Sequence, residues 1–438
     1  MARISLFTTI VATAVLPLCS GPASAQVGGV RIDASGLLHR VAATSSAPPI
    51  AETPGAFARR DSNRKLSLKR LEAAIADHLE SDRPLPDSIR YLAGLQRIDE
   101  VLLNPEQGDV VLVGPAAGWT RLPSGEVVDP ESHRPVLELD DLALALRFSA
   151  STDRDTSFIG CSIDPTRDGL KRYARYLKGL SGSITPRRIP KLVQGMQRAM
   201  GPQDVRIFGV PADSRFACKL VAADYRLKRV AMGFDRPPIK GLVNYVDLLA
   251  KANPSAVRRQ HRFWFVAIHD GLSRSPDSRT WRFSGSCLAV RTAASSSGDE
   301  DDDRKASPIA KRMAANLTSR FTDLARHIPV FADLENLVRL TVATEIALHA
   351  PLPASARRWR SRLLVEPKRF RRRTSPAPRR VSSLASIRKA RGRNWVLSVS
   401  GGVKVEPPPI RQKDLVRVDR QLVRSKHHAP TSGAWWWD

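Results

Sequence analysis

The sequence has few cysteines, and their arrangement excludes two common scaffolds. Only 4 of the 438 residues are Cys, and Cys19 lies in an apolar N-terminal run. Cys161, Cys218 and Cys287 remain, an odd number that excludes a disulfide-rich framework. Their spacings match no zinc motif. We expect three buried thiols, because an unbridged Cys packs as a small apolar residue. A Cys161–Cys287 disulfide is the alternative, because both residues lie in strand-like runs.

Long hydrophobic runs are absent beyond the first 25 residues. The run from Ile4 to Leu18 follows Arg3 and precedes Ala23-Ser24-Ala25, as in a cleaved signal peptide. It is shorter than the roughly 20 residues that span a bilayer. We expect residues 1–25 to be a signal peptide cleaved near Ala25, and the protein to be periplasmic or extracellular. No transmembrane segment is expected after cleavage, and no intracellular nucleic acid is expected as a partner.

Acidic residues are scarce relative to basic ones. The chain has 70 Lys and Arg against 43 Asp and Glu, a formal net charge of +27. Such an excess favours polyanionic partners but carries no information about the fold. Arg supplies 54 of the 70 basic residues, a bias that a GC-rich genome also produces. Only the placement of the charge is therefore informative.

The charge is concentrated in residues 351–438, which hold 22 Lys and Arg against 5 acids. A composition rich in Arg, Pro and Ser predicts a basic, largely disordered tail, with a short hairpin near 395–405. We expect this tail to contact anionic surface polymers or lipid head groups, and its removal after Ala350 to leave stability nearly unchanged. The candidate contacts are Arg369, Arg371, Arg372, Arg373, Arg379 and Arg380.

The remaining chain is predicted to fold as α+β, in one or two compact units. Its strand-like and helix-like runs lack the regular spacing of βαβ units. Ser67 is a good N-cap for a helix over 67–80, and further helices are expected at 165–180, 187–200 and 214–232. The expected organisation is an N-terminal hairpin and linker at 26–64, α+β regions at 65–150 and 151–292, an acidic mobile insertion at 293–307 and a helix pair at 308–350.

Motifs of catalytic, metal and phosphate sites are also missing. The sequence contains no Gly-Lys-Ser, His-Glu-x-x-His or Gly-x-Ser-x-Gly. His261 and His269 are eight residues apart on one strand, about 26 Å, too far for one metal ion. Asp140, Asp141 and Asp164 are expected to cap helices. We predict no catalytic, cofactor-binding or metal-binding residues and a non-enzymatic envelope or interaction protein. The alternative is a secreted hydrolase whose site only the tertiary structure assembles.

Short motifs are distributed over most of the chain, and they are Val27-Gly28-Gly29-Val30 with Asp33, Ala117-Gly118-Trp119, Arg134-Pro135-Val136-Leu137, Leu139-Asp140-Asp141-Leu142, Gly160-Cys161-Ser162-Ile163-Asp164-Pro165-Thr166, Ala223-Asp224-Tyr225-Arg226, Pro329-Val330-Phe331-Ala332 and Ser400-Gly401-Gly402-Val403. Together these motifs resemble an uncharacterised family of secreted planctomycete proteins that is defined only by a domain of unknown function. The resemblance covers about 27–350, plus 400–403, and implies a single exported unit without established catalytic residues. The acidic 299–303 and the Arg-rich 357–393 depart from the family pattern.

Overall fold

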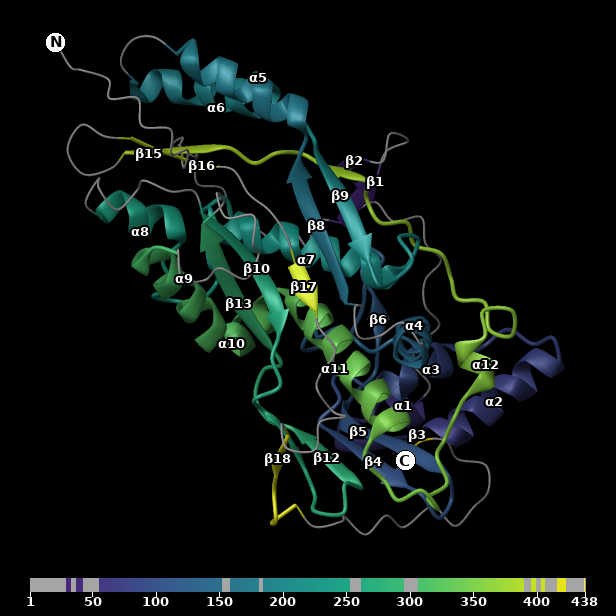
Figure 1. Ribbon diagram of the computed structural model, residues 1–438. Coiled ribbons are helices and arrows are strands. Elements are labelled where there is room, and N and C mark those ends of the chain that lie inside the picture. Colours follow the sequence, from purple (N-terminus) through teal and green to yellow (C-terminus); the bar gives the residue numbers. More distant parts are fainter. Residues whose placement is uncertain are drawn as a thin grey trace.

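The α+β prediction is confirmed by the computed structural model, in which helices pack around mixed sheets (Figure 1). The signal peptide predicted at 1–25 and most of the acidic insertion lie outside the described residues. The structure describes residues 29–32, 37–41, 55–151, 158–180, 184–252, 261–294, 306–389, 395–398, 403–405, 416–422 and 437.

The larger sheet draws its strands from widely separated parts of the chain. The hairpin predicted at the start of residues 26–64 corresponds to β1 and β2, which pair antiparallel. Strand β8 pairs antiparallel with β9, and β10 with β13. The eight strands, in spatial order, are β1 (Gly29–Ile32), β2 (Leu37–Val41), β14 (Arg380–Val381), β9 (Gln203–Phe208), β8 (Ile159–Pro165), β17 (Val403–Val405), β10 (His261–Ala267) and β13 (Leu288–Ala294).

A second sheet joins the two predicted α+β regions. Strand β12 pairs with β4, so the sheet crosses the boundary predicted at 150/151, and one apolar core extends through both regions. Strand β3 begins at Asp61, inside the predicted linker. The six strands, in spatial order, are β18 (Arg417–Val418), β11 (Leu272–Arg274), β12 (Thr280–Phe283), β4 (Glu100–Asn104), β5 (Asp109–Ala116) and β3 (Asp61–Ser67). Two-stranded ribbons are formed by β6 (Thr120–Arg121) with β7 (Val127–Val128), and by β15 (Ser386–Lys389) with β16 (Trp395–Ser398).

Most of the helices lie close to their predicted positions. Ser67 caps α2 as expected, its hydroxyl accepting from the Arg70 amide. The helix pair predicted at 308–350 is instead three helices, because the chain breaks at Arg320 between α9 and α10. The helices are α1 (Gly55–Ala58), α2 (Leu68–Glu80), α3 (Asp87–Arg90), η1 (Leu92–Gly94), α4 (Leu139–Ala150), α5 (Arg167–Lys178), η2 (Pro186–Arg188), α6 (Ile189–Met200), α7 (Arg215–Ala231), α8 (Tyr245–Lys251), α9 (Pro308–Ser319), α10 (Phe321–His327), α11 (Pro329–His349) and α12 (Arg362–Val365).

Helix α11 is the central element of the fold (Figure 1). The sequence predicts an amphipathic helix, but α11 is buried on nearly all sides, including its charged residues Asp333, Glu335 and Arg339. Its neighbour α7 supplies Arg215 and Lys219 as partners for Asp333. Arg339 pairs instead with Glu335, one turn earlier in α11, and with Asp99. Among the described residues, no helix is both long and apolar enough to cross a membrane.

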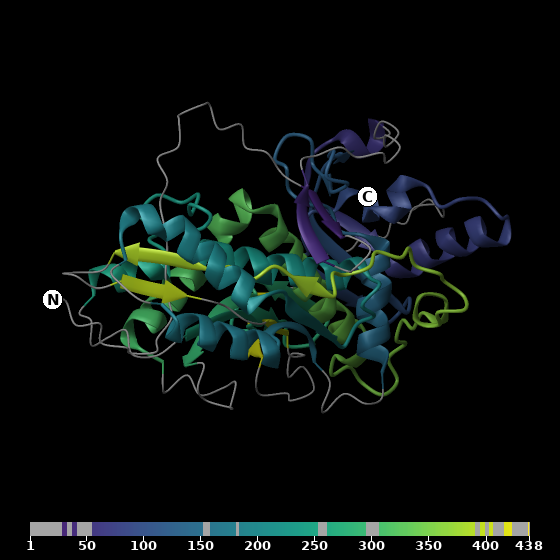
Figure 2. The same cartoon turned by 90° about the horizontal axis from the view of Figure 1, so that it is seen from above.

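Residues 351–389, which we name the strap, pack on the folded body, so the prediction of disorder was wrong for this segment. The strap runs along the molecule from α12 through β14 to β15 (Figures 1 and 2). Apolar side chains placed among its arginines reach the main core, and these are Trp359, Leu364, Phe370 and Val381. The Trp359 indole and the Ser361 hydroxyl donate to Glu72 of α2, at 3.1 and 2.7 Å. The strap is therefore part of the folded unit.

The hairpin predicted near 395–405 does not form, although both of its strands exist. Strand β16 pairs with β15 of the strap, whereas β17 inserts into the large sheet between β8 and β10. The alternation of apolar residues located the strands. Their partners lie elsewhere in the chain and could not be recognised from a local turn signal.

A pair of helices is inserted between β8 and β9. Pro165 of β8 faces Gln203 of β9, and the described residues between them include α5, η2 and α6, which together we name the basic hairpin. Its small core also includes Ala385 and Ile387 of the strap and is separate from the main core. The helices approach closely at Gly195, where a Cβ would lie 2.1 Å from the Tyr176 hydroxyl. The hairpin projects from one end of the molecule (Figure 1).

Candidate functional site

The densest group of charges is a buried network around Arg215 at the start of α7. The Arg215 guanidinium contacts Glu138 at 2.7 Å, Asp333 at 2.6 Å and also Asp141. Lys219, one turn later, reaches Asp333 at 2.6 Å and Glu126 at 2.9 Å. These ion pairs join α4, α7 and α11. Lys219 belongs to the helix predicted at 214–232, and its side chain is only 11% exposed.

The pKa values of two carboxyl groups in this network are shifted in opposite directions. Burial raises the pKa of Asp141 to about 7, and the nearby Glu138 and Asp333 reinforce the rise against the attraction of Arg215. Burial also opposes ionisation of Asp333, but Arg215 and Lys219 outweigh it and lower its pKa. Asp141 Oδ1 is buried and has no hydrogen-bond partner within the described structure. Protonation of Asp141 therefore removes a negative charge that is poorly solvated in the interior.

The strap covers this network. Arg373 Nε donates to Asp140 and its Nη2 to Glu138, both at 2.7 Å, while Arg372 pairs with Asp213. Asp140 and Asp141 were expected to act as caps, but they make these ion pairs instead. Asp164 lies in β8, and Thr166 caps α5 in its place. The contacts join the strap to α4 and to the segment before α7, which supports a structural role for the network.

The three cysteines are not joined by a disulfide. Cys161 in β8 and Cys287 before β13 are separated in the sheet by β17 and β10. Neighbouring strands are about 4.8 Å apart, so the two residues are beyond the roughly 7 Å that a disulfide can bridge. Cys218 donates its thiol proton to the Ser375 carbonyl at 3.2 Å, and burial raises its pKa. That thiol is therefore protonated at neutral pH.

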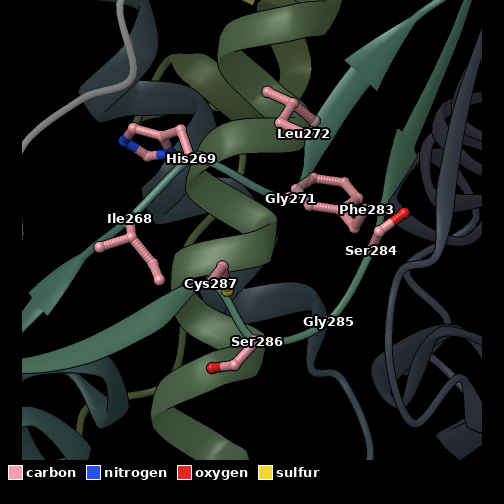
Figure 3. Close-up of a pocket in the computed structure, with 9 residues that line it drawn as sticks. All are labelled: Ile268, His269, Gly271, Leu272, Phe283, Ser284, Gly285, Ser286 and Cys287. Carbon is pink, nitrogen blue, oxygen red and sulfur yellow. The ribbon is translucent and has the colours of Figure 1, made fainter. Parts of the chain in front are cut away.

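A cavity beside Cys287 is too small for a substrate. Its volume is about 10 Å³, room for about one water molecule. In Figure 3, His269, Ser284 and Ser286 point in different directions instead of toward a common point. Burial raises the pKa of the Cys287 thiol to about 12. The side chains between β11, β12 and α11 are therefore closely packed and leave no room for a ligand.

His261 has a structural role in the fold. Its Nδ1 lies 2.9 Å from the Tyr245 hydroxyl, and its Nε2 accepts the Ser307 amide at 2.9 Å. Both ring nitrogens are thus used in joining β10 to α8 and α9. In the described part of the chain, no three His, Cys, Asp or Glu residues are grouped to hold a metal ion.

The six candidate arginines of the tail separate into two groups. Arg369, Arg372, Arg373 and Arg380 form ion pairs with Glu366, Asp213, Glu138 and Asp140, and Asp204, respectively. Arg371 and Arg379 are exposed and form no ion pair with any described residue. Most of the predicted contact surface is therefore used within the protein.

The basic hairpin holds a larger exposed surface that the sequence analysis overlooked. Between Arg167 and Met200 the chain has nine basic residues and one acid, Asp168. All nine are exposed because the apolar residues of both helices face each other and β15. The signal was available in the sequence, since basic and apolar residues alternate there with helical spacing. The nine are Arg167, Lys171, Arg172, Arg175, Lys178, Arg187, Arg188, Lys191 and Arg198.

Comparisons with known proteins are consistent with part of the suggested family relationship. No curated protein and no solved structure matches the chain. A protein-family model matches residues 161–245, which begin in β8 and end at the first residue of α8. This segment contains the basic hairpin, Arg215 and Lys219. Residues 161–245 are a domain that matches the family described as "Protein of unknown function (DUF1598)".

Proposed function

We propose that the protein is a non-enzymatic interaction protein of the cell envelope that binds anionic surface polymers through its basic hairpin. One observation carries the proposal, namely the nine exposed basic side chains against one acid on α5, η2 and α6. Exposed like charges on a projecting element attract polyanions over about 8 Å at physiological ionic strength. The proposal moves the contact from the tail arginines to the hairpin.

A polymer suits this surface better than a lipid bilayer. A 12-residue helix is about 18 Å long, so the charges of α5 and α6 can contact several repeats of a linear polyanion. Interfacial helices also bury an apolar face in the lipid. The apolar faces of α5 and α6 are used in their own core, and of the large apolar side chains described in the hairpin, Leu170 alone is well exposed, at 46%.

The compartment is part of the same proposal. The apolar run at 4–18 and Ala23-Ser24-Ala25 support export. The resemblance to secreted planctomycete proteins supports it too, and an anionic envelope polymer would be available to an exported protein. N-terminal sequencing of protein from the producing cell tests this step, with Gln26 expected as the first residue. An intact Met1 on exported protein would contradict it.

Heparin chromatography tests the polymer contact. A triple variant of α5, Lys171→Gln, Arg175→Gln and Lys178→Gln, is expected to elute at clearly lower salt than the parent protein. A matched triple variant of the strap, Arg357→Gln, Arg360→Gln and Lys368→Gln, removes the same number of exposed charges. It is expected to shift elution less.

Comparing the elution shifts of the two triple variants distinguishes a contact made by the basic hairpin from an effect of total net charge. Equal shifts for the two triple variants would show that only total charge matters, and the hairpin proposal would fail. Retention on anionic vesicles but not on heparin or dextran sulfate would point to a membrane instead. Circular dichroism and thermal unfolding of each variant exclude loss of structure as the cause.

A further inference from the structure

An open cavity lies between the α7–α8 segment and the strap, outside the buried network. Its volume is about 680 Å³, within the roughly 300–1,000 Å³ typical of small-molecule sites. Another surface cleft, beside Arg97 and Arg339, has about 290 Å³. Strand β15 forms one wall of the larger cavity and α8 another.

Successive side chains of β15 point to opposite faces of the strand, and this places a basic side chain at the cavity. Ile387 is buried in the core of the basic hairpin. Its neighbour Arg388 lines the cavity instead and lies 3.0 Å from Asp247 of α8. Asp247 also accepts the Asn244 side-chain amide at 2.7 Å. The one acid that lines the cavity is thus already matched by Arg388.

Three further cations remain at the cavity without an ion pair in the described part of the chain. Arg236, Lys251 and Lys389 are exposed and line it from the α7–α8 loop, the end of α8 and the end of β15. The acid nearest in sequence, Asp235, is held by Arg226 and Arg229 at 2.6 and 2.8 Å. The cavity therefore has an uncompensated positive rim.

Its wall also has an apolar part. Phe234, Pro237 and Val243 are half-buried, and Leu242 is buried beside them. Apolar walls with a few placed charges are the usual composition of sites for small organic ligands. A ligand that only carried charge would leave this apolar wall in contact with water.

We propose that this cavity is a binding site for a small organic anion, with an apolar body against Phe234 and Pro237 and a phosphate, sulfate or sulfonate group at Arg236 and Lys251. The inference is independent of the polymer contact on the basic hairpin. It assigns a ligand class to a site formed jointly by the domain at 161–245, by α8 and by the strap.

The aromatic sulfonate 8-anilinonaphthalene-1-sulfonate is a suitable probe, and N-phenyl-1-naphthylamine is the same body without the charged group. We expect the full-length protein to bind one sulfonate probe per chain, with the neutral probe bound far more weakly. Losing a hydrogen bond to a charged group weakens binding about tenfold or more. The double variant Arg236→Gln, Lys251→Gln should therefore bind the sulfonate at least about tenfold more weakly. Phe234→Ala should weaken both probes.

The triple variant of α5 is the matched control, since it removes exposed charges on the other face of β15. It should lose heparin retention and keep the sulfonate site. An unchanged dissociation constant in the double variant would overturn the inference, as would equal binding of the two probes or no saturable binding. Thermal unfolding of each variant verifies that the probe reports on folded protein.

Discussion

The strap and the basic hairpin have nearly the same composition, but the protein uses their charges differently. The strap has thirteen basic residues and one acid, and the hairpin has nine and one. In the strap, apolar side chains enter the main core and four of the arginines named above meet carboxylates. In the hairpin, the apolar residues pack mainly on one another and on β15, and the charges face solvent. Basic composition alone therefore does not tell whether charge is available to a partner.

Truncation after Ala350 should have the largest effect, and it reverses the expectation drawn from composition. It removes Trp359, Leu364, Phe370 and Val381 from the core, together with several strands. Each such side chain contributes about 1.5–3 kcal/mol, against a total stability of about 5–15 kcal/mol. We expect no cooperative thermal transition in the truncated chain. A melting temperature close to that of the full chain would show that the strap is dispensable.

Excising the hairpin is the counterpart of this truncation. Because Pro165 faces Gln203, a short Gly-Ser turn can replace 167–200 and still connect β8 to β9. Ile387→Thr in the same variant makes the apolar surface that excision uncovers on β15 more polar. We expect the cooperative transition to persist, as followed by calorimetry. Loss of folding here would show that the hairpin and the strap are equally integral.

Substitution of Arg215 or Arg373 tests how burial affects the free energy of unfolding that is lost when a cation is removed. Arg215→Gln leaves Glu138, Asp141 and Asp333 without their shared partner, and breaking such buried pairs costs about 3–5 kcal/mol. The Arg373 side chain is 42% exposed, so solvent screens its pairs and Arg373→Gln should cost about 1 kcal/mol. Urea unfolding measures both. Equal losses of unfolding free energy would show that the Arg373 contact stabilises the protein as much as the buried network does.

The network beneath the strap should make stability depend on pH. The folded pKa of Asp141, about 7, lies above its unfolded value, so the folded state binds the extra proton. That contribution is complete below about pH 4 and is lost as pH rises to about 7. Asp141→Asn should flatten this part of the profile in urea unfolding between pH 4 and 8. Asp333 acts oppositely, because its lowered pKa gives stability that is lost only in stronger acid. A slope unchanged by Asp141→Asn would show that another group is responsible.

The exposed charges of the hairpin should affect stability least. The α5 triple variant alters side chains at the surface, and such changes usually shift stability by no more than about 0.5 kcal/mol. Chemical unfolding should therefore overlay that of the parent protein. A clear gain in stability would instead show that repulsion among these cations strains the folded hairpin.

Local patterns in the sequence determined much of the secondary structure. Ser67 was recognised as the N-cap of α2, and the predicted strand that contains His261 corresponds to β10. These signals depend on backbone geometry within a few residues, so they can be recognised without knowing the fold.

Only the tertiary structure decided where charges and strands find their partners. Arg373 pairs with residues more than 230 positions earlier, and β17 joins β8 and β10 from the far end of the chain. Composition assigned residues 351–389 to a disordered tail because Trp359 and Phe370 are too few to form a core alone. They are buried because the rest of the protein supplies that core and the carboxylates beside it. Net charge is a sum over the chain, whereas ion pairing and burial depend on proximity in space.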